Sequence, residues 1–384
     1  MAHIQLGTTG TLSVPRTMQA AVLGTAGEMY VRERAVPHPG SEDVLVRVRR
    51  ASLCGTDLKI LNRTFFKDVG PAPGEFTPGH EYAGIVAAIG DSVTEFAVGD
   101  RVVTEAHRGC MRCTNCLRGS YTDCLNYGLP EMGHRTLGMT VNGGFAEYVV
   151  NHVSTLHRLP ETVSFDEAVI LTTVGTVMHA FDVLNSLVAG ATVAVIGPGP
   201  IGLLAVQVAK QLGASFVTLV GTRDSRLQLA EQFGADLVIN STTEDAVQAV
   251  RSHTNGLGAE IVIECSGAPT AVSQALHMSS RAGRVVLVGF FNEPVLVDLN
   301  FAVMNGVTMY SVRGEGSGSI QRAVTLATQG RLDLAPLITH HFPLSEISTA
   351  FEVYAERRDN AMKVMLDISE EGGLYHDLAP VQGV

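Results

Sequence analysis

The sequence lacks long apolar runs, basic blocks and dispersed cysteines. No apolar run approaches the roughly 20 residues of a membrane-spanning helix, so we expect no membrane segment. The 27 lysines and arginines are outnumbered by 38 aspartates and glutamates, which gives a net charge of −11 and argues against nucleic acid or an anionic membrane as a partner. The first residues show no basic segment followed by an apolar one, so we expect no signal peptide and a cytoplasmic protein.

Charged residues are also scarce, at 17%, whereas 46% of the 384 residues are hydrophobic. This composition suits a large buried core and excludes a disordered chain. A chain of this length is expected to form two domains. Four of the six cysteines fall between Cys110 and Cys124. In a large chain, such clustering is typical of metal ligands and not of a disulfide framework.

The glycine-rich turn at 197–202 is the clearest motif. An apolar run at 191–196 precedes the pattern G-x-G-x-x-G, and an apolar helical pattern follows it. The first glycine allows a tight turn, the second lets backbone approach a pyrophosphate, and the third lets the helix pack closely on the strand. The pattern predicts a dinucleotide site, the alternative being an ordinary turn between core elements. The expected contacts are Gly197, Gly199, Pro200, Ile201 and Gly202.

Short apolar runs alternate with helical patterns after residue 191. We predict strands at 191–196, 216–220, 237–239, 261–264, 284–288 and 307–312. Strands that alternate with helices indicate a parallel, doubly wound α/β sheet. Residues 18–103 instead show short strands and turns, typical of a small β-barrel. After 313 we predict helices at 319–328 and 345–354 and an apolar strand at 363–368, which could return to the first domain.

Cys110, Cys113, Cys116 and Cys124 supply four thiols within fifteen positions. Zinc binds four soft ligands in tetrahedral geometry, and closely spaced cysteines can wrap one ion. Four cysteines leave no open coordination position, so we predict a structural zinc. An iron–sulfur cluster and unliganded thiols are the alternatives.

A second metal constellation lies in the β module. Cys54-Gly-Thr-Asp57 and Gly79-His80-Glu81 contain the ligand types of a catalytic zinc that keeps one position open. Each residue alone is more often a core group, but their combination with a dinucleotide motif in the same chain favours alcohol or carbonyl chemistry. The hydroxyl of Thr56 could pass the alcohol proton. Asp57 could orient a ligand or cap a turn.

With these motifs, Gly99-Asp-Arg-Val102 and Gly143-Gly-Phe-Ala-Glu-Tyr148, the chain resembles the zinc-dependent medium-chain dehydrogenase/reductase family. The threonine, sorbitol and butanediol dehydrogenase branch is the most similar. The resemblance covers roughly 18–368. It implies a GroES-like catalytic domain at 1–163 and 313–384, with a zinc lobe at about 105–128, and a Rossmann domain at 164–312.

The resemblance also implies roles for single residues. Cys54 and His80 would bind the catalytic zinc, Thr56 would relay the proton, and Glu81 would be a nearby or exchanging ligand. Arg313 would lie near the cofactor phosphate or the substrate. Two zinc ions per chain and a homodimer or homotetramer are expected.

Two residues depart from the family pattern. Thr172 stands seven residues before His179, where members usually carry Cys, Glu or Asp. A neutral hydroxyl is a poor zinc ligand, so we predict that Glu81 supplies the third protein ligand. The alternative is that water fills the position. Lys59 stands where some alcohol dehydrogenases place a relay histidine.

We expect NADP(H) rather than NAD(H) as the cofactor. The second strand ends in Gly221-Thr222-Arg223, and Gly221 stands where similar NAD enzymes carry Asp. Thr222 and Arg223 could hold a 2′-phosphate, and Arg226 adds positive charge. Asp224 could bind the ribose instead. The remaining expected cofactor contacts are Ser266, Val288 and Arg313.

The predicted activity is hydride transfer between NAD(P) and a secondary alcohol, polyol or amino alcohol, or the corresponding ketone. One alternative is a zinc-poor reductase of an activated double bond. The other is a protein that binds zinc and a dinucleotide without turnover.

Overall fold

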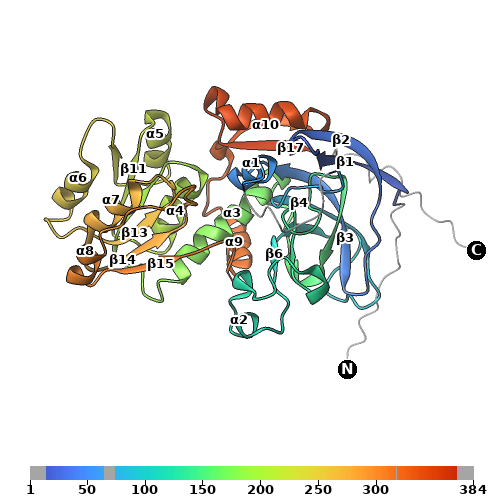
Figure 1. Ribbon diagram of the computed structural model, residues 1–384, viewed down its shortest axis with the longest axis horizontal. Coiled ribbons are helices and arrows are strands. Elements are labelled where there is room, and N and C mark those ends of the chain that lie inside the picture. Colours follow the sequence, from blue (N-terminus) through green and yellow to red (C-terminus); the bar gives the residue numbers. More distant parts are fainter. Residues whose placement is uncertain (1–13, 65–73, 317, 370–384) are drawn as a thin grey trace, which may run out of the picture. The chain divides into compact units, whose positions relative to one another are not determined.

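The computed structural model describes residues 14–64, 74–316 and 318–369 (Figure 1). Contacts divide the chain into two compact units. The first unit comprises Met1–Cys116, Asp123–Val169 and Thr339–Val384, and the second comprises Leu117–Thr122 and Ile170–Ile338. Among the described residues, no helix has both the length and the apolar character needed to cross a membrane.

The first unit is built on a seven-stranded sheet in which the pairings from β17 to β9 are antiparallel. Its order is β16 (Ile338–Pro343), β17 (Lys363–Asp367), β3 (Asp43–Ser52), β4 (Tyr82–Ile89), β5 (Arg101–Thr104) and β9 (Leu156–Arg158), with β8 (Tyr148–His152) also paired to β3. Separate two-stranded pairs are β1 (Thr17–Leu23) with β2 (Met29–Ala35), and β6 (His107–Arg108) with β7 (Arg135–Thr136). The position of β17 beside β3 confirms that the C-terminal strand returns to the first unit.

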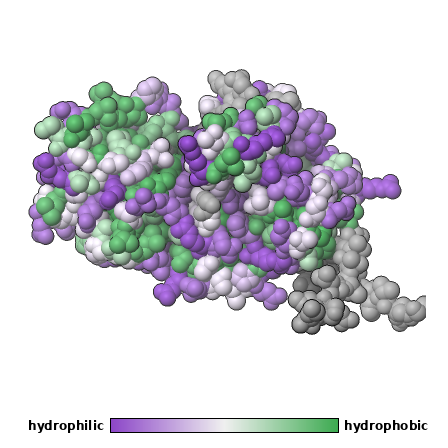
Figure 2. All heavy atoms as spheres, turned by 90° about the horizontal axis from the view of Figure 1, so that it is seen from below, coloured by the Kyte–Doolittle hydropathy of each residue, from purple (hydrophilic) through white to green (hydrophobic). Residues whose placement is uncertain are grey.

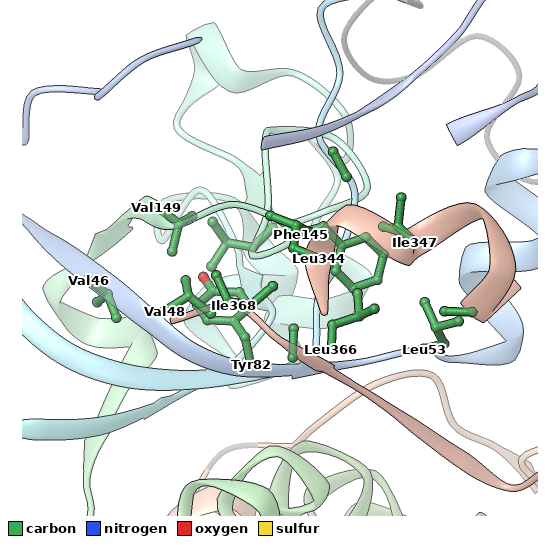
Figure 3. Packing of buried hydrophobic residues seen from close by; sticks show 14 of the residues in the cluster. Val46, Val48, Leu53, Tyr82, Phe145, Val149, Leu344, Ile347, Leu366 and Ile368 are labelled. Atoms are coloured by element: carbon green, nitrogen blue, oxygen red, sulfur yellow. The ribbon is translucent and has the colours of Figure 1, made fainter. Parts of the chain in front are cut away.

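The core of the first unit lies between this sheet and α10 (Ile347–Glu356). Figure 3 shows the side chains of Tyr82, Phe145 and Leu366 gathered with others of the cluster. The rings of Phe145 and Phe351 meet edge to face, with centroids 6.3 Å apart. On β3, Leu45 is as buried as its neighbours, because it packs in a second cluster on the other face of the sheet.

The second unit contains a six-stranded sheet in which every neighbouring pair is parallel. Its order is β12 (Leu237–Asn240), β11 (Phe216–Gly221), β10 (Thr192–Ile196), β13 (Ala259–Glu264), β14 (Ser279–Leu287) and β15 (Thr308–Ser311). The order reverses between β10 and β13, which confirms the predicted doubly wound sheet. Its central strand β10 is almost entirely apolar, as expected for a strand whose two faces are covered by helices. A dinucleotide binds at such a reversal.

Seven helices are described from residue 165 to 328, and Figure 1 shows several of them against the strands of the second unit. They are α3 (Phe165–Asp182), α4 (Pro200–Gln211), α5 (Asp224–Gln232), α6 (Ala246–His253), α7 (Ala271–Met278), α8 (Leu299–Asn305) and α9 (Ser319–Thr328). The helix predicted after the glycine turn is α4, and the one predicted at 319–328 is α9, whereas α8 was not predicted. The structure also forms β16 between the two helices predicted after residue 313, where no strand was predicted.

Two expectations need correction. Strands and turns were expected around residue 57, but the chain forms α1 (Gly55–Leu61) there, because the Asp57 carboxylate accepts the N–H of the N-cap residue Cys54 at 2.8 Å. The segment 313–338 was assigned to the catalytic domain, but its contacts place it in the second unit. The physical reason is packing within that unit: the amide of Gln207 on α4 exchanges two hydrogen bonds, of 2.8 and 2.7 Å, with the backbone of Asp333.

Candidate active site

Three potential metal ligands meet in the first unit. One ligand atom each from Cys54, His80 and Glu81 lies within 4.8 Å of the others. Cys54 follows β3, and His80 and Glu81 precede β4. The antiparallel pairing of β3 with β4 brings these two ends together. A thiolate, an imidazole and a carboxylate are the donor set of a zinc site, so the residues present fit the expected ion.

Asp57 organises two of these groups. It is 1% exposed, its Oδ2 accepts the Cys54 N–H, and its Oδ1 lies 3.4 Å from Nδ1 of His80. A carboxylate behind a ligating histidine fixes the ring and its tautomer. Burial alone would lower the pKa of His80, but Asp57 and then Cys54 outweigh it, so that pKa lies well above its ordinary value. The cluster therefore attracts positive charge.

Glu81 belongs to this cluster and also to a buried ion pair. Its Oε2 lies 2.5 Å from Nζ of Lys363, and both residues are 3% exposed. The same oxygen accepts the hydroxyl of Ser52. Burial alone would raise the pKa of Glu81, but Lys363 and then His80 outweigh it and lower that pKa. Glu81 is thus held as a carboxylate. Lys363 was missed by sequence analysis, although a lysine within an apolar strand is a signal.

The four clustered cysteines also form a site. Their sulfurs lie within 4.8 Å of one another, with 4.0 Å between Cys110 and Cys116 and 3.9 Å between Cys113 and Cys124. Tetrahedral zinc places its thiolate sulfurs about 3.8 Å apart, so the spacing fits. Main-chain N–H groups donate to these sulfurs, and donation from Arg112 is the largest of the causes that lower the pKa of Cys110 to about 6. Such donation stabilises the thiolate that a metal requires.

The glycine turn after β10 has the expected geometry. Gly197 has a φ of +106°, and a Cβ at Gly202 would lie 1.9 Å from the Gly197 carbonyl. These two positions therefore require glycine. A Cβ at Gly199 would meet nothing within 4 Å. The second glycine therefore borders open space at the amino end of α4, where a pyrophosphate fits.

The end of β11 is tightly packed against this turn. A Cβ at Gly221 would lie 2.5 Å from the ring of Pro198. Thr222 is exposed, and Arg223 is the N-cap residue of α5. Asp224 accepts a hydrogen bond of 2.6 Å from the side-chain amide of Asn240. Asp224, the acidic residue that could bind the ribose instead, is therefore already hydrogen-bonded within the protein.

Comparisons with known proteins agree with this geometry. The model of the alcohol dehydrogenase GroES-like domain matches residues 40–161, and that of the zinc-binding dehydrogenase matches 200–329. The chain is 38% identical to L-threonine 3-dehydrogenase of Bacillus subtilis, over 84% of this chain and 90% of that protein. It is 36% identical to L-threonine 3-dehydrogenase of Symbiobacterium thermophilum, over 88% of this chain and 94% of that one. The chain belongs to the zinc-binding alcohol dehydrogenase family.

Solved structures agree with this assignment. Alcohol dehydrogenase from Thermus sp. ATN1 matches 92% of this chain and 100% of its own, with 30% identity and a TM-score of 0.81. A zinc-binding dehydrogenase from Sinorhizobium meliloti, solved bound to NADP, matches 91% of this chain and 99% of its own, with 29% identity and a TM-score of 0.83. The protein whose sequence is described here is thus an NAD(P)-dependent zinc oxidoreductase that acts on alcohols. The two alternative functions find no support in these matches.

The other predicted residues of the dehydrogenase fall into both units. Thr56 is half-buried on the first turn of α1, and Arg226 is 8% exposed on α5. Thr172 is buried on α3 in the second unit. The guanidinium of Arg313 donates to the carbonyl of Thr122, a group that the sequence did not suggest for it.

The four-cysteine site yields a stability prediction. Cys113→Ser removes one thiolate from a short lobe with little core of its own, so we expect the free energy of unfolding to fall by more than about 2 kcal/mol and the zinc content to fall. Melting curves and metal analysis measure both. Cys265→Ser is the control, because Cys265 lies outside the cluster. Unchanged melting and metal content in Cys113→Ser would contradict a structural metal site.

The Cys54 cluster yields a second prediction. Glu81→Gln replaces the third ligand, a carboxylate, by a neutral amide, so we expect the variant to lose zinc from this site while the four-cysteine site keeps its ion. Metal analysis after mild chelation measures the difference. Ser52→Ala is the control, because it removes a hydrogen bond to the same oxygen without removing a ligand. Full zinc retention by Glu81→Gln would mean that water fills the third position.

Proposed function

We propose that the enzyme oxidises the secondary hydroxyl group of a small polar alcohol, with L-threonine as the foremost candidate, and passes the hydride to NADP+. The cluster of Cys54, His80 and Glu81 within 4.8 Å carries the proposal for the chemistry. The similarity to L-threonine 3-dehydrogenases supports the substrate class.

Two zinc sites are proposed. Cys54, His80 and Glu81 would hold the catalytic ion, and the four cysteines of the lobe would hold the structural one. When bound, the catalytic zinc supplies a Lewis acid that polarises the alcohol or carbonyl oxygen. Asp57 keeps the imidazole of His80 oriented, and Lys363 balances the charge of Glu81. Four clustered cysteines that act as metal ligands suit a reducing compartment, and we infer the cytoplasm.

The proton path is proposed to begin at Thr56. Its hydroxyl lies two residues after Cys54 on the first turn of α1. Lys59 follows at i+3, which places the two side chains on one face of the helix. Burial lowers the pKa of Lys59 against the opposite influence of Cys54, which eases proton exchange at its amine. We propose that Thr56 takes the alcohol proton and that Lys59 passes it outward.

The substrate proposal predicts a ranking of rates. With zinc-loaded enzyme and NADP+, we expect kcat/KM for L-threonine to exceed that for 2,3-butanediol and sorbitol by about tenfold or more, about 1.4 kcal/mol in activation free energy. Initial rates of cofactor reduction measure this ranking, and the Thr56→Ala variant serves as a slow control. Turnover of a diol or polyol but not of threonine would reject the substrate while keeping the reaction. No turnover of any secondary alcohol would reject the function.

The preference for NADP(H) is proposed from the end of β11. No carboxylate stands at Gly221, and the ring of Pro198 leaves no room for one. Thr222 offers a hydroxyl, and Arg223 carries the planar guanidinium that suits a phosphate dianion. Asp224, the competing acid, is held by Asn240. One structural relative was solved bound to NADP and another was solved with NADH.

The cofactor proposal predicts a ratio of catalytic efficiencies. We expect kcat/KM with NADP+ to exceed that with NAD+ by about tenfold or more. Because a Cβ at residue 221 meets Pro198 at 2.5 Å, the exchange Gly221→Asp with Arg223→Asn should reverse the preference only when Pro198→Ala is added. Pro198→Ala alone is the control and should keep the NADP preference. A tenfold preference of the unaltered enzyme for NAD+ would contradict the proposal.

A homo-oligomer is also proposed. β15 ends the six-stranded sheet and therefore offers one edge with main-chain groups that a second copy could pair. Close to it in the chain, α8 exposes Leu299, Val303 and Met304, and Leu296 is 94% exposed. Figure 2 shows apolar side chains gathered in several groups on the second unit, to the left of that view. Exposed apolar groups beside a sheet edge support self-association through this unit.

A further inference from the structure

The carboxyl group of Glu264 lies at the carboxyl end of β13, and the mechanism above does not use it. The side chain is completely buried, at 0% exposure. In the parallel sheet, Glu264 pairs with Ile196, the residue before the glycine turn. It therefore lies where the strand order reverses, beneath the region in which a dinucleotide binds.

One oxygen of this carboxyl group holds the loop that follows β13. Oε1 accepts the main-chain N–H groups of Ser266 at 2.6 Å and Gly267 at 3.0 Å, and it also accepts the Ser266 hydroxyl. Gly267 has a φ of +64°, so this loop has a conformation that few residues adopt readily. Three donors to one buried oxygen fix that conformation, because losing the acceptor would leave the donors unsatisfied.

The other oxygen faces the loop that follows β14. Oε2 is buried without a hydrogen-bond partner, and a Cβ at Gly289 would lie 2.5 Å from it. The main-chain carbonyl of Glu264 accepts the N–H groups of Val288 at 2.8 Å and Gly289 at 3.0 Å. Burial raises the pKa of Glu264 against the hydrogen bonds from Ser266 and Gly267. One residue thus contacts the loops after two neighbouring strands.

We propose that Glu264 is a positioning residue for the nicotinamide half of the cofactor, an inference that rests on the proposed function. The adenosine half is expected at the end of β11, near Arg223, on one side of the glycine turn. The other half then extends over β13 and β14, whose following loops contain Ser266 and Val288. A Cβ at Gly197 would lie 2.9 Å from Ser266, so turn and loop are packed in direct contact. Glu264 therefore fixes the conformation of the loops after β13 and β14, which form the surface on which the nicotinamide half lies.

Shortening the side chain tests this role. Glu264→Asp withdraws the carboxyl group by about 1.5 Å, which separates it from the three donors. We expect the Kd of the preferred reduced cofactor to rise by about tenfold or more. The Kd of its adenosine fragment, 2′,5′-ADP for NADPH or 5′-AMP for NADH, should stay within about twofold, since the adenosine side is untouched. Calorimetric titration of the zinc-loaded enzyme measures both constants.

Two further variants make the test decisive. Glu264→Gln keeps an acceptor oxygen at the same reach, so we expect it to bind the cofactor within about threefold of the unaltered enzyme. Glu260→Asp is the matched control, because Glu260 lies at the other end of β13 and its carboxylate also accepts a main-chain N–H, from Thr192 at 2.9 Å. It should change neither constant.

The possible results distinguish a failure of the inference on Glu264 from a failure of the proposed function. Unchanged cofactor binding in Glu264→Asp would overturn the inference. Equal loss of cofactor and fragment, with a lower melting temperature, would also overturn it, because it would indicate general structural support. Glu264→Gln binding as weakly as Glu264→Asp would exclude the acceptor geometry as the cause. Failure of the unaltered enzyme to bind either cofactor would instead reject the proposed function.

Discussion

The first unit depends on the balance of buried negative charge. Asp57 and Glu81 are almost completely removed from water, and Cys54 adds a thiol that a metal would bind as an anion. Burying such charge is costly unless each group has a cation or hydrogen-bond donors. The fold supplies these partners from distant segments. Asp57 accepts the N–H of Cys54, the N-cap residue of α1, and lies beside His80, which precedes β4. Glu81 pairs with Lys363 on β17. The ion pair between Glu81 and Lys363 spans 282 residues of sequence, so Glu81 has this cation beside it only when β17 is in the sheet. The dication proposed between Cys54, His80 and Glu81 would complete this balance.

The second unit could be predicted well because its signals are local. A glycine turn between a strand and a helix is typical of a dinucleotide site in a parallel sheet. Apolar strands that alternate with helices are compatible with only a few topologies. The first unit was less predictable. The helix α1 was hidden because the residues that start it, Cys54 and Asp57, are also those that suggest a metal site. The segment 313–338 was misassigned because its packing on Gln207 involves residues more than a hundred positions away. No local pattern contains that information.

The site residues also differ in whether a local sequence signal reveals them. Cys54, His80 and the four lobe cysteines could be found because their chemical types and spacing are themselves the signal. Lys363 and Glu264 were missed, although each is a charged residue within an apolar strand. Such residues are rare in cores and are normally paired or hydrogen-bonded. Their partners, Glu81 in one case and the loop at Ser266 in the other, could not be named before the strands were arranged. Single polar residues in apolar strands are therefore worth treating as candidates from the start.

In the proposed preference for NADP(H), the steric exclusion of an acidic residue at position 221 acts together with the charge of Arg223. An acidic residue at 221 would need a Cβ where the ring of Pro198 lies, 2.5 Å away, and real Cβ atoms essentially never approach so closely. Overpacking of this kind costs about 1–3 kcal/mol, whereas an exposed ion pair contributes about 0–1 kcal/mol. The proline of the glycine turn therefore disfavours the NAD-type acid more strongly than Arg223 alone favours a phosphate. Since Pro198 belongs to the glycine turn and Gly221 to the neighbouring strand β11, an exchange of the proposed cofactor would require both elements to change together.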